Sequence, residues 1–255
     1  MKFPAFFSGL ILIPLSAFAE LTWSGPNKPD EDTLVLYHFD ESGSSITDHG
    51  PKGLNLSASQ SSALVSEPAD WLTNPAGGYF FPVGNGMEST GVLQNIQVKE
   101  VDFNKGLTIS FWCRSVDGEI QSGEIFQMEN PRVRVAVDDY GVKSNGRLRL
   151  EAPGLMEGDK PPMAEFGPLH IWRHVAVVYD PKNQAADDGG AWSLYLDGTL
   201  VGSIEDPNDL SKSHQFTLRV GGNTFNNGQL QGVQLDEFLI TNRVLSDFSA
   251  PSIRP

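Results

Sequence analysis

Short runs of β-branched and aromatic residues, separated by clusters of Gly, Asp, Asn and Pro, recur along most of the chain. Residues 107–114 alternate apolar and polar side chains, which is typical of a strand with one face on a core. Residues 172–179 are more continuously apolar and predict a central strand. No stretch longer than about two turns has apolar residues at helical spacing. We therefore expect an all-β fold, either a sandwich or a barrel.

The other predicted strands are short and lie between turn-forming residues. They are expected at residues 33–39, 124–128, 133–137, 147–150, 217–220 and 234–240. Residues 192–196 and 199–203 flank the pair Asp197-Gly198. Asp-Gly is favoured where both residues of a hairpin turn need positive φ, so this segment predicts a β-hairpin.

Composition and charge restrict the class of protein. The 255-residue chain has 18 Lys and Arg against 32 Asp and Glu, a net charge of −14. Because phosphate contacts need clustered Lys and Arg, we expect no nucleic-acid partner. Hydrophobic residues make up 39% of the chain, which is enough for a core. No linker divides residues 20–255, so a single domain is expected there.

The first 19 residues have the three parts of a secretory signal peptide. Lys2 supplies the positive start, residues 6–15 form the apolar stretch, and Ala17 and Ala19 are the small residues before a cleavage site. The apolar stretch is too short to cross a bilayer, and no later segment is apolar enough. The mature chain is expected to be exported, without a membrane span, into the medium, the periplasm or onto the cell surface.

Six segments with a common order and spacing carry a resemblance to a known family. They are residues 36–41 (LYHFDE) with Asp48 behind them, 107–112 (LTISFW), 172–180 (WRHVAVVYD), 194–202 (LYLDGTLVG), 218–222 (LRVGG) and 235–246 (LDEFLITNRVLS). From about residue 33 to 248 the chain resembles a bacterial laminin-G-like domain of the concanavalin A-like lectin/glucanase superfamily. The resemblance implies a jelly-roll sandwich of two antiparallel sheets with adjacent first and last strands. It does not select among lectins, adhesion modules, glycosidases and lyases.

Patterns for catalysis are missing from the sequence. Glycan-cleaving enzymes of the resembled superfamily often carry Glu-x-Asp-x-x-Glu on one strand, which aims an acid and a base into one groove. The nearest fragment here is Glu100-Val-Asp102, which has Lys105 in place of the last glutamate. Asp236 and Glu237 are adjacent, so strand alternation places them on opposite faces. No nucleophile motif occurs, and an enzyme is less favoured than a binding protein.

The resemblance also implies a place for calcium, where the first and last strands meet. The candidate ligands are Asp40 and Asp48, after the first strand, and Asp236 on the last strand. Carboxylates mixed with backbone carbonyls suit one structural calcium ion. In the alternative interpretation, Asp40 and Asp48 cap a turn and Asp236 pairs with Arg243 or a backbone amide.

Sugar binding by ring stacking needs aromatic faces that are open in a groove or loop. Trp112 lies on the polar face of its predicted strand, and Trp71 lies in a segment without strand pattern. These two are the candidate ligand contacts, and the alternative is that they are core or seam residues. Cys113 has no partner for an internal disulfide and is expected to be a small buried residue.

These observations predict an exported, non-catalytic module that binds carbohydrate or an extracellular or cell-surface partner. A glycoside hydrolase or polysaccharide lyase on the same sandwich is one alternative. It would show two carboxylates converging in a groove. A structural or assembly protein is the other alternative, and it would show a large exposed apolar patch.

Overall fold

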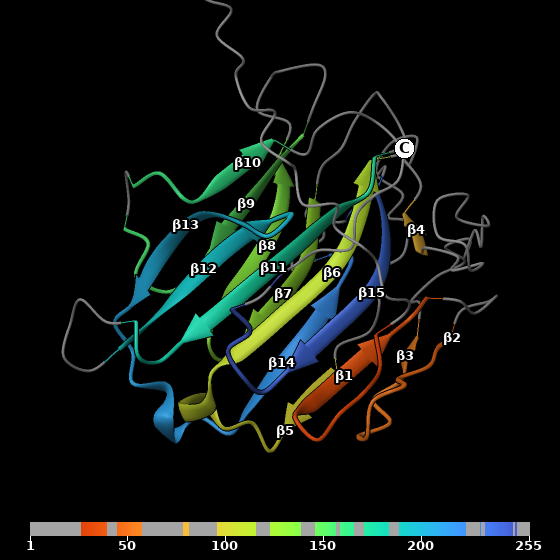
Figure 1. The fold of residues 1–255 in the computed structure, drawn as a ribbon, viewed down its shortest axis with the longest axis horizontal. Helices are drawn as coiled ribbons and strands as arrows, with labels where there is room; N and C mark the ends of the chain where they lie inside the picture. Colours follow the sequence, from red (N-terminus) through yellow and green to blue (C-terminus); the bar gives the residue numbers. More distant parts are fainter. Residues whose placement is uncertain are drawn as a thin grey trace, which may run out of the picture.

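The computed structural model of the chain is built almost entirely from strands (Figure 1). It describes residues 27–39, 45–57, 79–81, 96–115, 123–138, 146–156, 159–165, 171–183, 189–222, 230, 233–246 and 248. The predicted signal peptide, residues 1–19, lies outside this part of the chain. None of the described residues forms a helix long and apolar enough to cross a membrane.

Two large antiparallel sheets make up the fold. The first, in the order β1-β15-β6-β11-β12-β13 with β4 beside β15, is formed by β1 (Thr33–Tyr37), β4 (Tyr79–Phe81), β6 (Leu107–Ser115), β11 (Arg173–Asp180), β12 (Gly190–Leu196), β13 (Thr199–Asp206) and β15 (Val233–Thr241). The second, in the order β10-β9-β8-β7-β14-β5, is formed by β5 (Ile96–Lys99), β7 (Gly123–Glu129), β8 (Val133–Asp138), β9 (Arg147–Glu151), β10 (Met163–Glu165) and β14 (Gln215–Val220). The predicted all-β sandwich is confirmed, and its first and last described strands, β1 and β15, are adjacent.

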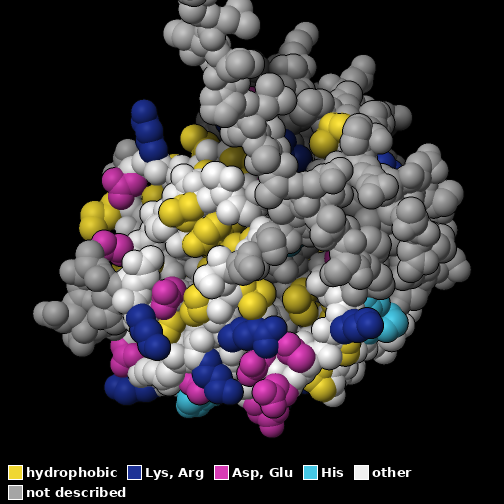
Figure 2. Space-filling model, viewed as in Figure 1, with side chains coloured by type: hydrophobic (Ala, Val, Ile, Leu, Met, Phe, Trp, Pro, Cys, Tyr) yellow, Lys and Arg dark blue, Asp and Glu magenta, His cyan; other side chains and the backbone are white. Residues whose placement is uncertain are grey.

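Three smaller elements complete the described chain. They are the two-stranded sheet of β2 (Ser45–Ile46) and β3 (Leu56–Ser57) and the 3₁₀ turns η1 (Phe103–Lys105) and η2 (Leu210–Lys212). The two turns lie at the lower margin in Figure 1. In the same view, side chains of Lys, Arg, Asp and Glu intermingle along this margin (Figure 2).

Aromatic packing joins the two sheets through their inner faces. Phe111 of β6 stacks on Phe238 of β15, with ring centroids 5.6 Å apart. Phe126 of β7 meets both rings edge-on, at 6.1 and 6.0 Å. Such aromatic pairs add about 0.5–1.5 kcal/mol each beyond the burial of their area. Cys113 lies in the same core, as expected, and burial raises the pKa of its thiol well above the usual value.

The predicted hairpin is confirmed between β12 and β13. Asp197 and Gly198 both have positive φ, 47° and 77°. The Asp197 carboxylate accepts a hydrogen bond from the amide of His174 at 2.9 Å and pairs with Arg173 at 2.5 Å. The turn is thereby tied to the neighbouring strand β11.

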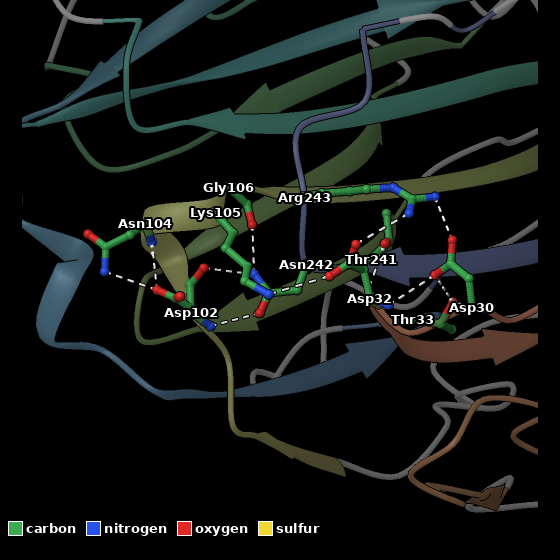
Figure 3. A network of polar contacts seen from close by, with 10 residues as sticks. All are labelled: Asp30, Asp32, Thr33, Asp102, Asn104, Lys105, Gly106, Thr241, Asn242 and Arg243. Carbon is green, nitrogen blue, oxygen red and sulfur yellow. Dashed lines mark hydrogen bonds and ion pairs between the residues drawn. The ribbon is translucent and has the colours of Figure 1, made fainter.

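A polar network, which we call the terminal clasp, joins the ends of β1 and β15 to η1 (Figure 3). Asn242 accepts a hydrogen bond from the amide of Asp102 through Oδ1 and donates through Nδ2 to the carbonyls of Asp102 and Gly106, all at 2.8 Å. Arg243 pairs with Asp30 at 2.7 Å and Asp32 at 3.4 Å. The clasp therefore holds the start of β1 beside the end of β15.

Candidate functional site

The aspartates predicted to bind calcium have different surroundings. Asp40 lies outside the described residues. Asp48 is buried, and its Oδ1 accepts hydrogen bonds from the amides of Leu36 (2.9 Å) and Gly50 (2.8 Å). Its Oδ2 accepts a hydrogen bond from the amide of Leu54 at 2.7 Å. The Asp48 carboxylate therefore holds the loop between β2 and β3 against β1.

Asp236 is fully buried in β15, opposite Trp112 of β6. Its Oδ1 accepts a hydrogen bond from the amide of Glu237 at 2.8 Å. The Glu237 carboxylate in turn contacts Nδ1 of His38 at 2.8 Å and accepts from the amide of Asn27 at 2.7 Å. In the described part of the chain, no three His, Cys, Asp or Glu side chains are arranged to hold a metal ion. The calcium site stays a prediction.

A β-bulge lies at Asp236 and Glu237. Leu235 and Phe238 both belong to the hydrophobic core, so two residues separate these inward-facing positions instead of one. The register of β15 against β6 shifts at this point, and Glu237 has a φ of 50°. The strict alternation that predicted opposite faces for the two carboxylates is therefore interrupted.

The tryptophans predicted as sugar contacts do not form an open aromatic surface among the described residues. Trp71 lies outside them. Trp112 is on the outer face of the seven-stranded sheet, as predicted, but is only 4% exposed and lies 5.2 Å from the ring of His174. Burial lowers the pKa of His174 to about 4. A stacking platform needs an exposed ring face, so Trp112 does not supply one.

The outer face of the six-stranded sheet is mostly polar, with Ala136 of β8 and Met163 of β10 as apolar residues on it. In β9, Leu148 and Leu150 enter the core, so the residues between and beside them face outward. The same alternation holds in β14, where Phe216 and Leu218 face inward. We define the polar face as Gln97 and Lys99 of β5, Gln215, Thr217 and Arg219 of β14, Glu124, Gln127 and Glu129 of β7, Arg134 of β8, and Arg149 and Glu151 of β9.

Charged groups occupy one half of the polar face. Arg134 contacts Glu124 at 2.5 Å and Glu151 at 2.6 Å. Arg149 contacts the other oxygen of Glu151 at 2.8 Å. Burial alone would lower the pKa of Arg134, but the hydrogen bonds and charges of Glu151 and Glu124 outweigh it and raise that pKa. These side chains are occupied with one another and form a rigid charged support.

The other half of the polar face opens into two pockets beside the edge strand β5. One pocket, of about 390 Å³, is lined by Gln97, Asn130, Lys212, Ser213, His214, Gln215, Phe216 and Thr217. The other, of about 510 Å³, is lined by Lys52, Leu54, Gln97, Lys99 and Glu100. Gln97 lines both, and we call the two pockets together the β5 groove. Ligand pockets in proteins have volumes of about 300–1,000 Å³, so the groove is large enough to hold a small ligand.

Strand pairing and turns assemble the groove. Thr217 pairs with Gln97, and Gln215 pairs with Lys99, which places these four outward side chains on two neighbouring strands. Asn130 and Glu100 border the pockets in the left-handed region, with φ of 65° and 60°. Asn tolerates this conformation better than most residues because its short amide can bond locally. The groove therefore has defined walls in the described structure.

Hydrogen-bonding groups dominate this site. Carboxamides and hydroxyls both donate and accept, as sugar hydroxyls do, and the lysines only donate. The carboxamide of Gln97 is exposed and makes no hydrogen bond with the described residues. The arrangement suits reversible recognition of a hydroxylated ligand. Ser213 and His214 both line the smaller pocket, and the His214 ring contacts the carbonyl of Val101 at 3.4 Å and not the Ser213 hydroxyl.

None of the groove residues is among the predicted site residues. Alternation in 217–220 and 147–150 indicates which side chains face outward, but it does not tell which strands are neighbours. The available signal was the long polar side chains at outward positions of several strands. Only the pairing of β14 with both β5 and β7 turns these separate positions into one surface.

Comparisons with known proteins agree with the observed fold. Residues 90–248 match the laminin G-type family model described as the Concanavalin A-like lectin/glucanases superfamily. A search of curated proteins gave no match.

Three similar solved structures are toxin binding domains. The binding domain of botulinum neurotoxin serotype D has a TM-score of 0.56 at 10% identity and covers 84% of this chain and 49% of that chain. The serotype D/C VPI 5993 binding domain has a TM-score of 0.52 at 13% identity, with the same coverage. The binding domain of botulinum neurotoxin DC in complex with SialylT has a TM-score of 0.50 at 12% identity and covers 84% and 48%. The chain thus spans about half the length of these structures, and the likeness concerns the fold.

Proposed function

Because the chain belongs to the concanavalin A-like lectin/glucanase superfamily, we propose that it is an exported, non-catalytic module that binds carbohydrate in the β5 groove. Export rests on the predicted signal peptide of residues 1–19, and the ligand class rests on the chemistry of the groove. Superfamily membership alone would not separate binding from catalysis.

One observation carries the proposal: the smaller pocket of the β5 groove is open and lined mainly by groups that hydrogen-bond in both directions. Gln97, Gln215 and Thr217 present amides and a hydroxyl from two paired strands, and Asn130 and Ser213 add further such groups at the rim. A saccharide offers alternating donors and acceptors, which match this lining. A rigid sheet keeps the positions fixed, so little ordering entropy is lost on binding.

Similar solved domains support a binding role by analogy. One of them is a toxin binding domain described in complex with SialylT. At 12% identity this likeness transfers no residue, and it supports only that sandwiches of this shape serve as binding domains.

The alternative function, glycan cleavage, can be judged from a pair of carboxylates on the polar face. Glu124 and Glu151 approach each other across β7, β8 and β9 because both contact Arg134. Glycosidases use two carboxyl groups about 5–10 Å apart, one of which protonates the leaving group. Here a single guanidinium engages both carboxylates, which leaves neither directed at a substrate. We therefore favour binding.

The test is a polysaccharide-binding screen with the exported protein, in calcium and again in EDTA. We expect retention on at least one polysaccharide and no release of sugar. The variant Gln97→Ala/Thr217→Val should weaken that binding at least tenfold, about 1.4 kcal/mol. Thr199→Val, an exposed threonine at the start of β13 on the other sheet, is the matched control and should bind normally.

The outcomes separate the candidates. Retention that the groove variant does not weaken would move the site elsewhere, and sugar release would favour the hydrolase or lyase. Absence of binding to every polysaccharide would overturn the carbohydrate proposal in favour of a protein partner. Retention that EDTA abolishes would support the predicted calcium and direct attention to Asp40, Asp48 and Asp236.

A further inference from the structure

We infer that the β5 groove selects acidic saccharides, and that it holds a carboxylate or sulfate substituent beside Lys99 and Lys212. This inference rests on the proposed function and names the ligand class of the same groove. It follows from the local charge, the availability of the ammonium groups and the register of the two strands.

The charge of the groove opposes the charge of the chain. The chain as a whole carries a net charge of −14. Among the described residues, the smaller pocket has Lys212 and His214 in its lining and no carboxylate, and the larger has Lys52, Lys99 and Glu100. An acidic protein surface repels anions, so a basic groove within it provides a local site of attraction.

The lysines of the groove differ in whether their ammonium groups already contact other residues of the chain. Lys52 donates to the carbonyl of Lys99 at 2.8 Å and to Glu100 at 2.9 Å, and its hydrogen bond and charge lower the pKa of Glu100. Lys52 is thus paired with Glu100, the carboxylate found among the described residues of the groove lining. The Lys99 ammonium is exposed and has no ion-pair partner among the described residues.

Lys212 is also available to a ligand. Its side chain is 90% exposed and lies 3.9 Å from the carboxylate of Asp209, one turn earlier in η2. Exposed pairs of this length contribute little, so an anion of the ligand can compete for the ammonium. Asp209 itself is held by the amide of Ser211 at 2.9 Å, which orients the start of the turn that carries Lys212.

The strand register places neutral and charged contacts side by side. Lys99 pairs with Gln215, and Gln97 pairs with Thr217 two residues away on the same face. Directly paired side chains on neighbouring strands lie about 4.5–5.5 Å apart at Cβ. A sugar ring held by Gln97 and Thr217 therefore has its substituents within reach of the ammonium groups.

Paired polymers that differ only in charge test this inference. Comparison of polygalacturonate with its methyl ester measures what a carboxylate contributes to binding. Comparison of dextran sulfate with dextran measures what a sulfate contributes. We expect the acidic member of at least one pair to bind at least tenfold more tightly at low salt, with a preference that falls as salt screens it. Because the whole chain is negative, nonspecific attraction would not produce this preference.

Lys99→Gln/Lys212→Gln should remove most of the preference for the acidic polymer over its neutral partner. The control is Lys160→Gln/Lys182→Gln, which removes two exposed lysines distant from β5: Lys160 precedes β10 at the opposite edge of the sheet, and Lys182 follows β11 in the other sheet. Equal effects of the two double variants would overturn the inference, as would neutral polymers that bind as well as acidic ones. Failure of all four polymers to bind would instead count against the proposed function itself.

Discussion

The terminal clasp and the β5 groove use the same kinds of side chain for opposite purposes. In the clasp, the carboxamide of Asn242 is buried and makes three hydrogen bonds to the backbone around η1. In the groove, the carboxamide of Gln97 is exposed and bonds to none of the described residues. A polar group that has satisfied its hydrogen bonds within the chain stabilises the fold, whereas one that has not is available to a ligand.

The polar face shows a gradation between these two extremes. Its charged half, around Arg134, is engaged internally, and its β5 half opens into pockets. Between them, Gln127 is buried, donates to Glu129, and has an Oε1 without a hydrogen-bond partner in the described structure. Support and recognition thus occupy neighbouring parts of one sheet.

The largest effect is expected in the clasp. Asn242→Ala removes three hydrogen bonds, one buried and two partly buried, and leaves the Asp102 amide without its acceptor. At about 1 kcal/mol per bond, we expect the free energy of unfolding to fall by about 3 kcal/mol. Urea denaturation followed by tryptophan fluorescence measures it. The folded fraction should bind polysaccharide normally, and a binding defect without a loss of stability would reverse the assignment of this region.

Breaking the charged support should have a smaller effect. Arg134→Met leaves Glu124, 4% exposed, without this partner, and we expect a loss of about 2 kcal/mol because the cluster is only partly buried. The companion variant Glu124→Gln/Arg134→Met also removes the charge of Glu124 and should recover part of the loss. If the double variant is as unstable as the single one, the charge of Glu124 is not the cause.

The groove variant Gln97→Ala/Thr217→Val should have the opposite effect to the clasp variant: it should lose binding and keep its stability. We expect its free energy of unfolding to stay within about 0.5 kcal/mol of the parent, as is usual for surface substitutions, while polysaccharide affinity falls at least tenfold. Parallel denaturation and binding titrations compare the two quantities on one sample. A stability loss as large as that of Asn242→Ala would show that the groove is structural.

The smallest effect is expected for the exposed ion pairs of the clasp. Burial alone would raise the pKa of Asp30, but the hydroxyl of Thr33 and the guanidinium of Arg243 outweigh it and lower that pKa below 3.8. A lowered folded-state pKa means that ionised Asp30 contributes stability above about pH 4, which is lost as the pH falls through the folded value. Arg243→Ala should therefore cost less than about 1 kcal/mol at pH 7 and flatten the stability profile below about pH 4. An unchanged profile in acid denaturation would exclude this pair as its source.

Much of the fold was predictable because strand signals are local. Residues 107–114 have a period of two, and the observed β6 (Leu107–Ser115) follows it with Phe111 and Cys113 inside. The Asp197-Gly198 turn was predictable for the same reason, since it depends on the φ preferences of two residues. By contrast, the alternation failed at Asp236 and Glu237, because a β-bulge is decided by the partner strand.

The site was less predictable. Trp112 was correctly assigned to the outward face of its strand, yet the structure buries it against His174. Alternation indicates which face a side chain occupies and carries no information on what covers that face. The groove depends on Gln97 and Thr217, which are far apart in the sequence and have no motif of their own.

The sequence by itself determined the class of this protein: an all-β fold of short strands, with its outward residues, its hairpin turn and its acidic balance. These properties arise from the side-chain period of a strand, the φ preferences of turn residues and the count of charges. Only the tertiary structure decided which strands are neighbours and which outward groups find partners. Placing β14 between β7 and β5 created the groove, and bringing Asn242 to η1 created the clasp. Both depend on the burial of whole sheet faces. This burial involves residues far apart in the sequence, so no local sequence pattern predicts it.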